Sequence, residues 1–318
     1  MRNLLLYVSG VVLFLSCVMS CAHEGGSASS LDENYEYGAG SLRIPQRPSD
    51  AMTGSEFIEK TRFMSNRDRE DAIGREIVKG NIPNFLRQLK PIRVAVRDRF
   101  GKTHKGILLV MPDYLAIGSD ENFVRIPMTP ITAQKIADTF GMMLPTVKLV
   151  DAIYAQSDVH MVPAPLPAGK KMTSNEYYSR HNQMIERRLK SSANGKLIAG
   201  HKKDIVITRI LANRPYRVAI YGWHRGQGRP IQPLSTVHPN TYADYSHGIR
   251  LVSHSMTVDG KPVEVASILH DEKLAGIVSN EGTIRNVRLK TSGLYTAADA
   301  KPLTRDKKIL VADRKKRR

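Results

Sequence analysis

Cysteine is almost absent from this chain. Of its 318 residues only Cys17 and Cys21 are cysteines, and both lie close to the amino terminus. The part of the chain after residue 21 therefore has no disulfide, no thiolate-bound zinc and no cysteine nucleophile. It also carries no HExxH zinc motif and no evident internal repeat.

A long hydrophobic run is missing as well. The apolar segment from Leu4 to Val18, which follows Arg2, is short and lies at the very start of the chain. A membrane-spanning helix needs about 20 apolar residues, whereas a basic residue followed by a shorter apolar run is typical of a secretory signal. We expect residues 1–20 to be a signal peptide, with an uncleaved anchor as the alternative.

The end of this segment, "VMSC" from Val18 to Cys21, resembles the lipobox of bacterial lipoproteins. That motif has an aliphatic residue three positions before the cysteine and a small residue directly before it. The resemblance implies that Cys21 becomes the lipidated first residue and anchors the chain in a membrane through more than one acyl chain. Ala22 follows without an aspartate that would favour the inner membrane, so we expect an outer-membrane lipoprotein facing the periplasm or the cell surface.

Acidic residues are too few to balance the basic ones. The sequence has 48 Lys and Arg against 30 Asp and Glu, a formal net charge of +18. Such an excess favours anionic partners. For a secreted chain we expect an anionic envelope polymer or peptidoglycan as the partner, and no nucleic acid.

The order of sequence patterns predicts an α+β fold. Hydrophobic residues make up 41% of the chain, enough for a globular core. Residues 21–52 are rich in Gly and Ser and are typical of a flexible tether. Residues 53–190 mix helix and strand signals and predict an α/β amino-terminal region, whereas residues 196–300 are mostly strand-like and predict a β-rich catalytic domain. Residues 301–318 form a basic tail.

Local signals predict individual elements. "TGSE" from Thr53 is a capping box that predicts a helix running to Val78. Thr129 and Pro130, followed by Gly141, predict a short helix between them. Two strands are expected around residues 100–105. "KPVEVASIL" at 261–269 looks like a strand, and the segment after it like a short helix.

The candidate chemistry concentrates late in the chain. Five of the ten histidines fall between His201 and His254. Imidazole suits proton transfer near neutral pH and is the commonest metal ligand. His201, Asp204 and His247 could form a zinc site with an open position for water, if the fold brings them together.

A second possibility is nucleophilic catalysis by Ser246. This serine precedes His247 directly, and neighbouring side chains of an extended chain point to opposite faces. The two could therefore not pair with each other. The base for Ser246 would have to be His201 or His224.

A third possibility is acid–base catalysis by His247. Asp244 or Asp204 could orient its ring, and Arg250 could hold an anionic substrate group bidentately. Asp244, Ser246, His247 and Arg250 lie within seven residues around one glycine. The alternative is that these are turn and edge-strand residues satisfied by backbone hydrogen bonds.

The stretch "YSHGIRLVS" resembles the active-site string of L,D-transpeptidases, in which Ser-His-Gly is followed by a cysteine, an aliphatic residue, Arg and Leu. Residues 246–251 reproduce that string without the cysteine, which is the nucleophile of that family. Tyr221 and Gly222 stand where the family has a His-Gly pair. The strings "GHKKD" and "YSHGIRLV" also resemble segments of secreted bacterial proteins. These resemblances imply an envelope setting and a β-rich carboxy-terminal domain, and they leave the reaction open.

From the sequence we expect a cell-envelope lipoprotein that acts as a peptidoglycan- or glycan-directed hydrolase. The first alternative is a non-catalytic basic lipoprotein that binds the cell wall. The second is a divergent protein of the L,D-transpeptidase type. A divalent metal such as zinc is the cofactor that the histidines could bind.

Overall fold

The computed structural model of the chain describes residues 43–189, 195–226 and 228–289. The expected signal peptide, the lipidation at Cys21, most of the tether and the basic tail lie outside these residues. All of the described residues belong to one of the two compact units of the chain.

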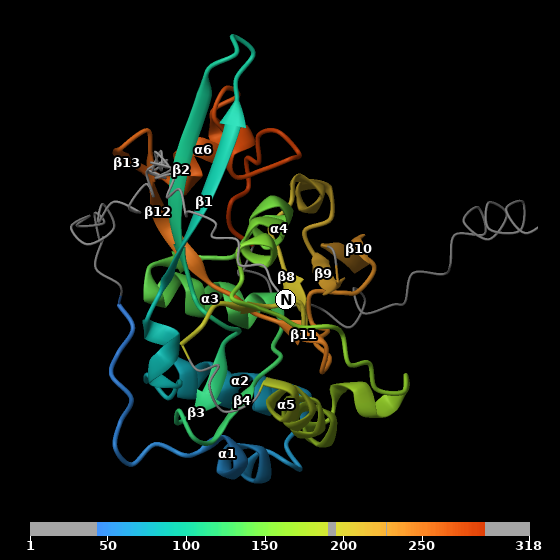
Figure 1. Cartoon of the computed structure of the whole chain (residues 1–318). Coiled ribbons are helices and arrows are strands. Elements are labelled where there is room, and N and C mark those ends of the chain that lie inside the picture. Colours follow the sequence, from blue (N-terminus) through green and yellow to red (C-terminus); the bar gives the residue numbers. More distant parts are fainter. Residues whose placement is uncertain (1–42, 190–194, 227, 290–318) are drawn as a thin grey trace, which may run out of the picture. The chain divides into compact units, whose positions relative to one another are not determined.

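Helices and sheets both occur in the described residues, as the α+β prediction expected (Figure 1). The α-helices are α1 (Gly54–Lys60), α2 (Asn66–Val78), α3 (Pro130–Phe140), α4 (Val147–Ala155), α5 (Asn175–Leu189) and α6 (Val265–His270). The 3-10 helices are η1 (Asn84–Arg87), η2 (Lys170–Thr173), η3 (Arg209–Asn213) and η4 (Ala275–Ile277).

The larger sheet has five strands in the order β1-β2-β12-β13, with β5 paired to β12. Its strands pair antiparallel throughout. The predicted ranges 53–190 and 196–300 both contribute to it, because β12 pairs with β2 across the sequence. The bounds are β1 (Lys90–Arg97), β2 (Thr103–Val110), β5 (Met142–Met143), β12 (Val252–Val258) and β13 (Lys261–Glu264).

The smaller sheet lies within the range predicted to be β-rich. Its order is β10-β9-β8-β11, in which β8 and β11 are parallel. The bounds are β8 (Lys203–Ile205), β9 (Ile220–Arg225), β10 (Arg229–Ser235) and β11 (His247–Gly248). Two strand pairs complete the structure: β3 (Ala116–Gly118) with β4 (Phe123–Arg125), and β6 (Val159–His160) with β7 (Ile198–Ala199).

Several helix ends follow the sequence signals. The Thr53–Glu56 capping box is formed, with each side chain bonded to the other residue's backbone N–H. Helix α3 begins after Thr129, whose hydroxyl accepts from Thr132, and it ends at Gly141 in the left-handed region (φ 66°). A side chain at Gly141 would be strained there, which explains why glycine ends this helix.

Two predicted elements differ from the structure. The expected helix over 53–78 is two helices, because Ser65 accepts a hydrogen bond from the Asp68 N–H and starts α2 anew. The expected strand over 261–269 continues only to Glu264, and Val265 begins α6. Val265, Ile268 and Leu269 are buried on one face of that helix, a spacing that suits a helical turn as well as a short apolar strand.

One hydrophobic core joins the larger sheet to the helices. It includes side chains from Phe57 in α1 to Ile284 near the end of the described residues. Helix α3 packs on α2 and buries Ile136, Ala137 and Phe140. Within residues 43–189, 195–226 and 228–289, no helix is long and apolar enough to cross a membrane.

Candidate functional site

The smaller sheet brings several of the predicted residues side by side. Lys203 in β8 lies opposite Gly222 of β9 on one side and His247 of β11 on the other. Asp204 lies likewise between Tyr221 and Gly248. Residues about 45 positions apart in the sequence therefore become neighbours, as a site built from His201, Asp204 and His247 requires.

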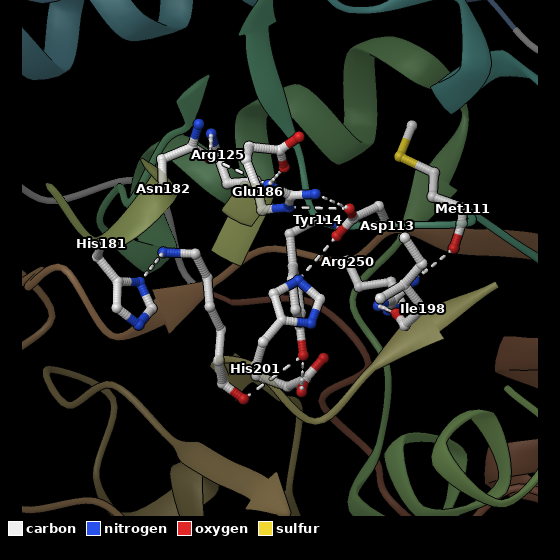
Figure 2. Close-up of polar contacts among 12 residues, drawn as sticks. Met111, Asp113, Tyr114, Arg125, His181, Asn182, Glu186, Ile198, His201 and Arg250 are labelled. Atoms are coloured by element: carbon white, nitrogen blue, oxygen red, sulfur yellow. Dashed lines mark hydrogen bonds and ion pairs between the residues drawn. The ribbon is translucent and has the colours of Figure 1, made fainter. Parts of the chain in front are cut away.

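A buried ionic cluster around Asp113 takes up one of the predicted histidines (Figure 2). One oxygen of the Asp113 carboxylate accepts from Arg125 Nε at 2.8 Å and Nη2 at 2.6 Å. The other lies 3.0 Å from His201 Nε2. All three residues are at most 1% exposed. Burial alone would raise the pKa of Asp113, but the charges of Arg125 and His201 hold it far below its usual range.

This ionic cluster is tied to helix α5. Arg125 Nη1 donates to the side-chain oxygen of Asn182 and forms an ion pair with Glu186, whose side chain is 41% exposed. The ring of His201 also lies edge-on to Tyr114, with centroids 4.8 Å apart (Figure 2). His201 is thus held by a structural partner on two sides, and burial lowers its pKa to about 4.

Lys202, the neighbour of His201, is buried too. Its ammonium donates to the Tyr245 carbonyl at 2.7 Å and lies 3.4 Å from His181 Nδ1. Burial and the charge of Arg125 lower the pKa of Lys202 to about 7. Burial and the charge of Lys202 hold the pKa of His181 far below its usual range.

Arg250 and Asp204 both contact Tyr114, one at its ring and the other at its hydroxyl. The Arg250 guanidinium lies 4.5 Å from the centre of the Tyr114 ring and donates to the carbonyl oxygens of Met111 and Ile198 (Figure 2). Arg250 is 1% exposed. These contacts give it a role in holding the fold, because a guanidinium bonded to two carbonyls beneath the surface is not available to a substrate carboxylate.

Asp204 accepts a hydrogen bond from the Tyr114 hydroxyl at 2.8 Å and is 3% exposed. Burial raises its pKa to about 6, and Arg250 opposes that rise. The sequence offered Asp204 as a possible orienter of His247. The structure gives it a tyrosine partner and places it one strand away from His247, at the register position of Gly248.

His224 belongs to a separate group of polar side chains. Its Nε2 lies 3.1 Å from Asp151, which also accepts from the Tyr221 hydroxyl at 2.8 Å. Its ring stacks on Tyr154 with centroids 4.3 Å apart. Asp151, in α4, is the carboxylate partner of His224. The base role that the sequence offered for His224 toward Ser246 has no hydrogen bond to support it among the described contacts.

Asp244, Ser246 and His247 form the second buried cluster, and its connectivity is unusual. Asp244 Oδ1 accepts from the Ser246 N–H at 2.8 Å and from the Ser246 hydroxyl at 2.5 Å. Asp244 Oδ2 accepts from the Tyr242 hydroxyl at 3.0 Å and lies 3.9 Å from His247 Nε2. The carboxylate therefore sits between the serine and the histidine, whereas a nucleophilic triad places the histidine in the middle.

The imidazole of His247 has no hydrogen-bond partner among the described residues. The side chain is fully buried, and both of its ring nitrogens are unsatisfied. An unpaired polar group in a protein interior is costly, and few occur in native structures. Burial lowers the pKa of His247 to about 4, an effect that the carboxylate of Asp244 only partly offsets. His247 is therefore neutral at pH 7 and can accept a proton.

A stack of rings leads from His247 to the surface. Tyr242 lies edge-on to His247 with centroids 5.8 Å apart, and His238 stacks on Tyr242 at 4.3 Å. His238 and Tyr242 are partly exposed. Lys203 is partly exposed as well, and its ammonium lies 5.1 Å from the centre of the Trp223 ring. Burial is the main reason why the pKa of His247 is low, and the positive charge of Lys203 lowers the pKa of His247 further.

The backbone beside this cluster is strained. Trp223 has φ 54°, one of two non-glycine residues with a positive φ in the described chain, and Gly222 before it has φ 102°. A bulky residue in the left-handed region costs roughly 1–3 kcal/mol and is most often found near functional sites.

We name the group of Lys203, Asp244, Ser246 and His247, with the covering rings of His238 and Tyr242, the His247 cluster.

The predicted metal site does not form. Among the described residues, no group of three His, Cys, Asp or Glu side chains is arranged to hold a metal ion. His201 is bonded to Asp113, Asp204 to Tyr114, and His247 faces Asp244, so the three predicted ligands point to different partners.

Comparison with known proteins adds no assignment: no family model, no curated protein and no solved structure matches the chain. The case for a function therefore depends on the geometry of the site.

Sequence reasoning missed several members of these clusters. Asp113 was not singled out as a site residue, because its partners Arg125 and His201 are 12 and 88 positions away. Lys203 was not singled out either. The one signal that could have marked it is its place in "GHKKD", beside the predicted His201 and Asp204.

Proposed function

We propose that this chain is a cell-envelope lipoprotein that hydrolyses peptidoglycan or a related glycan at the His247 cluster. The observation that carries this proposal is the buried imidazole of His247, which has no hydrogen-bond partner and lies 3.9 Å from the Asp244 carboxylate. A fold gains nothing from a buried imidazole with two unpaired nitrogens, whereas a neutral imidazole beside a carboxylate suits proton transfer.

In this proposal His247 acts as the general base. Its neutral ring accepts a proton from a water molecule as the water oxygen bonds to the substrate carbon, and the resulting imidazolium is stabilised by the Asp244 carboxylate. When the bond to the leaving group breaks, the imidazolium returns this proton to the leaving atom. Burial would raise the pKa of Asp244, but the nearby His247, the hydrogen bonds from Ser246 and the charge of Lys203 outweigh burial, so the pKa is lowered. The negative charge that the imidazolium needs is therefore already present in the resting protein.

Ser246 is a positioning residue in this mechanism. Its hydroxyl donates to Asp244 and not to a histidine, so no base is placed to remove its proton. Water is therefore the nucleophile that we propose. The Ser246 N–H and hydroxyl fix one oxygen of Asp244, which leaves the other oxygen to face His247.

The substrate in this proposal carries a negative charge close to the bond that is cleaved. Lys203 is the partly exposed cation of the cluster, and it lies opposite His247 in the sheet. It takes the anchoring role that the sequence gave to Arg250. The net charge of +18 favours encounter with an anionic polymer.

One observation favours a second function. Ser246 and His247 are both fully buried, and Tyr242 lies between His247 and the half-exposed His238. A substrate can reach His247 only if the Tyr242 ring moves. If it does not move, the chain is a basic lipoprotein that binds the cell wall without cleaving it.

The experiment that tests the proposal incubates the chain from residue 22 onward with purified peptidoglycan, with and without EDTA. The start at residue 22 keeps the segment before Thr53, where Arg47 donates to Asn81 and to the Gly118 carbonyl. Soluble fragments are identified by mass spectrometry. His247→Gln is the test variant, and His254→Gln, a half-exposed strand histidine outside the cluster, is the matched control.

We expect fragments from the wild type and from His254→Gln, and none from His247→Gln at an unchanged melting temperature. EDTA should leave the release unchanged. If the chain sediments with peptidoglycan and releases nothing, the hydrolase is wrong for this substrate and the wall-binding lipoprotein is the better interpretation.

A further inference from the structure

Among the described residues, no strand pairs with the outer half of the β1–β2 hairpin. β1 and β2 pair up to Arg97 and Thr103, but the pairing of β12 with β2 ends at Gly106. Figure 1 shows this hairpin extending beyond the other strands of the sheet. Residues 97–105 therefore form an arm that is held at its base by hydrogen bonds from His104 and Lys105 to Asp259, and we name them the hairpin arm.

The turn at the end of the arm is tightly held. The Asp98 carboxylate accepts from the N–H groups of Phe100 and Lys102 at 2.9 and 2.8 Å, and Gly101 adopts φ 85°. Asp98 also faces His104, which in turn bonds Asp259. The one acidic side chain of residues 97–105 thus serves the turn itself, and the arm presents Phe100 in a fixed position.

The surface of the arm combines one aromatic ring with cations. Phe100 is 74% exposed, and the Arg99 guanidinium lies 4.8 Å from the centre of its ring. Arg97, Lys102 and Lys105 are exposed beside them. An exposed aromatic ring surrounded by lysine and arginine is suited to the boundary between lipid headgroups and acyl chains, where the ring enters the apolar layer and the cations meet phosphates.

We propose that the hairpin arm binds an anionic lipid bilayer, with Phe100 inserted at the acyl boundary. A soluble anionic polymer would also attract the four cations, but it offers no apolar layer for the exposed ring. This inference does not depend on the hydrolase site. The His247 cluster and the arm share no residue, and either can fail without the other.

Phe63 provides a matched control on the same chain. It is 89% exposed and has an arginine, Arg62, 5.2 Å from its ring centre. Arg62, however, forms an ion pair with Glu59 at 3.5 Å, so the charge of this patch is compensated. The two phenylalanines share exposure and a stacked arginine, and they differ in the surrounding charge.

The test uses the full chain with vesicles of phosphatidylglycerol and phosphatidylcholine that carry brominated acyl chains, which quench tryptophan only inside the bilayer. Phe100→Trp and Phe63→Trp each add one exposed indole to the chain's single native tryptophan, Trp223, which is 6% exposed. We expect the added fluorescence of Phe100→Trp to fall at least about twofold, and that of Phe63→Trp to stay unchanged. Adding Arg99→Gln and Lys102→Gln to Phe100→Trp should lower the partition coefficient of the protein between water and vesicles by roughly fivefold per charge removed. The same quenching measures this coefficient.

The proposal is overturned if Phe100→Trp is not quenched while the protein sediments with the vesicles, since other basic segments would then explain the binding. Equal quenching of Phe63→Trp, or equal quenching of Phe100→Trp on neutral vesicles, would also overturn it. Protection of the Phe100→Trp indole by a soluble anionic polymer, with no effect of vesicles, would assign the arm to a polymer instead.

Discussion

Two buried clusters in this molecule contain the same kinds of side chain, an aspartate with a histidine and a cation close by, yet they are built differently. In the Asp113 cluster the carboxylate accepts from Arg125 and His201, and Arg125 is also paired with Glu186. In the His247 cluster the carboxylate of Asp244 accepts only hydroxyl and amide groups, and the imidazole beside it is unpaired.

This difference in hydrogen bonding distinguishes polar groups that stabilise the fold from polar groups that take part in a reaction. A buried charge whose hydrogen bonds are all made contributes to the unique fold, and removing one partner is costly. A buried group whose bonds are not made reduces stability and is retained only where it serves another purpose. Asp113, whose carboxylate bonds Arg125 and His201, is of the first kind. Among the described residues His201 has one bonded ring nitrogen and one without a partner, whereas His247 has two without partners, and we assign His247 to the second kind.

The largest expected effect comes from breaking the Asp113 cluster. Arg125→Met removes the two guanidinium donors to Asp113 and leaves a buried carboxylate with only His201 and the Tyr114 N–H as described partners. We expect the free energy of unfolding to fall by about 3–5 kcal/mol. Urea denaturation measures it, with Arg62→Met as the exposed control, which should cost less than about 1 kcal/mol. A loss below 1 kcal/mol for Arg125→Met would contradict the structural role of the cluster.

The comparison is sharpest for the two histidines. His201→Leu takes a hydrogen-bond partner from a buried carboxylate and should cost about 1–3 kcal/mol. His247→Leu removes a ring that makes no hydrogen bond, so its unfolding free energy should change by less than about 1 kcal/mol, or even increase. Equal losses in the two variants, again by urea denaturation, would show that His247 is as structural as His201.

A pH series tests the neutral state of His247. Its pKa is about 4 in the fold and 6.5 when unfolded, so between these values the unfolded chain binds more protons. Stability from this group is complete above pH 6.5 and is lost as the pH falls toward 4. Asp204, raised to about 6, has the opposite slope between 3.8 and 6. Between pH 7 and pH 5, the free energy of unfolding of His247→Leu should therefore fall by about 2 kcal/mol less than that of the wild type. Identical slopes would mean that the pKa of His247 is not lowered in the fold.

The smallest effect is expected for Ser246→Ala. The change removes one hydroxyl donor from Asp244, while the backbone N–H of residue 246 still reaches the carboxylate. We expect a loss of about 1 kcal/mol in stability and a decrease in hydrolysis of less than about tenfold. A covalent nucleophile would instead cost several orders of magnitude in rate. If the rate of fragment release fell by several orders of magnitude, Ser246 would be the nucleophile, and the proposal that water attacks directly would be wrong.

Some of the fold could be predicted from short stretches of sequence. Thr53 with Glu56 marks the start of one helix, and Thr129 and Gly141 mark the start and the end of another. Each of these signals needs only the residues of the turn next to it. The strand predicted over 261–269 failed at Val265, since a short apolar run fits a buried helix as well as a strand.

The site was predictable only in part. Asp244, Ser246 and His247 are close in sequence and are joined in the structure. The different roles of His201 and His247 were not predictable, because the partner of His201 is Asp113, 88 positions earlier. Both histidines are buried, and their hydrogen-bond partners distinguish them. Those partners come from distant parts of the chain.

The measurement that tests the central claim most directly compares wild type and His247→Leu in one experiment, with thermal unfolding and release of fragments from peptidoglycan recorded on the same samples. We predict that His247→Leu melts at or slightly above the wild-type temperature and releases no fragments, while the wild type releases them. Release by His247→Leu at the wild-type rate, or a large fall in its melting temperature, would contradict the claim that this histidine is kept for chemistry.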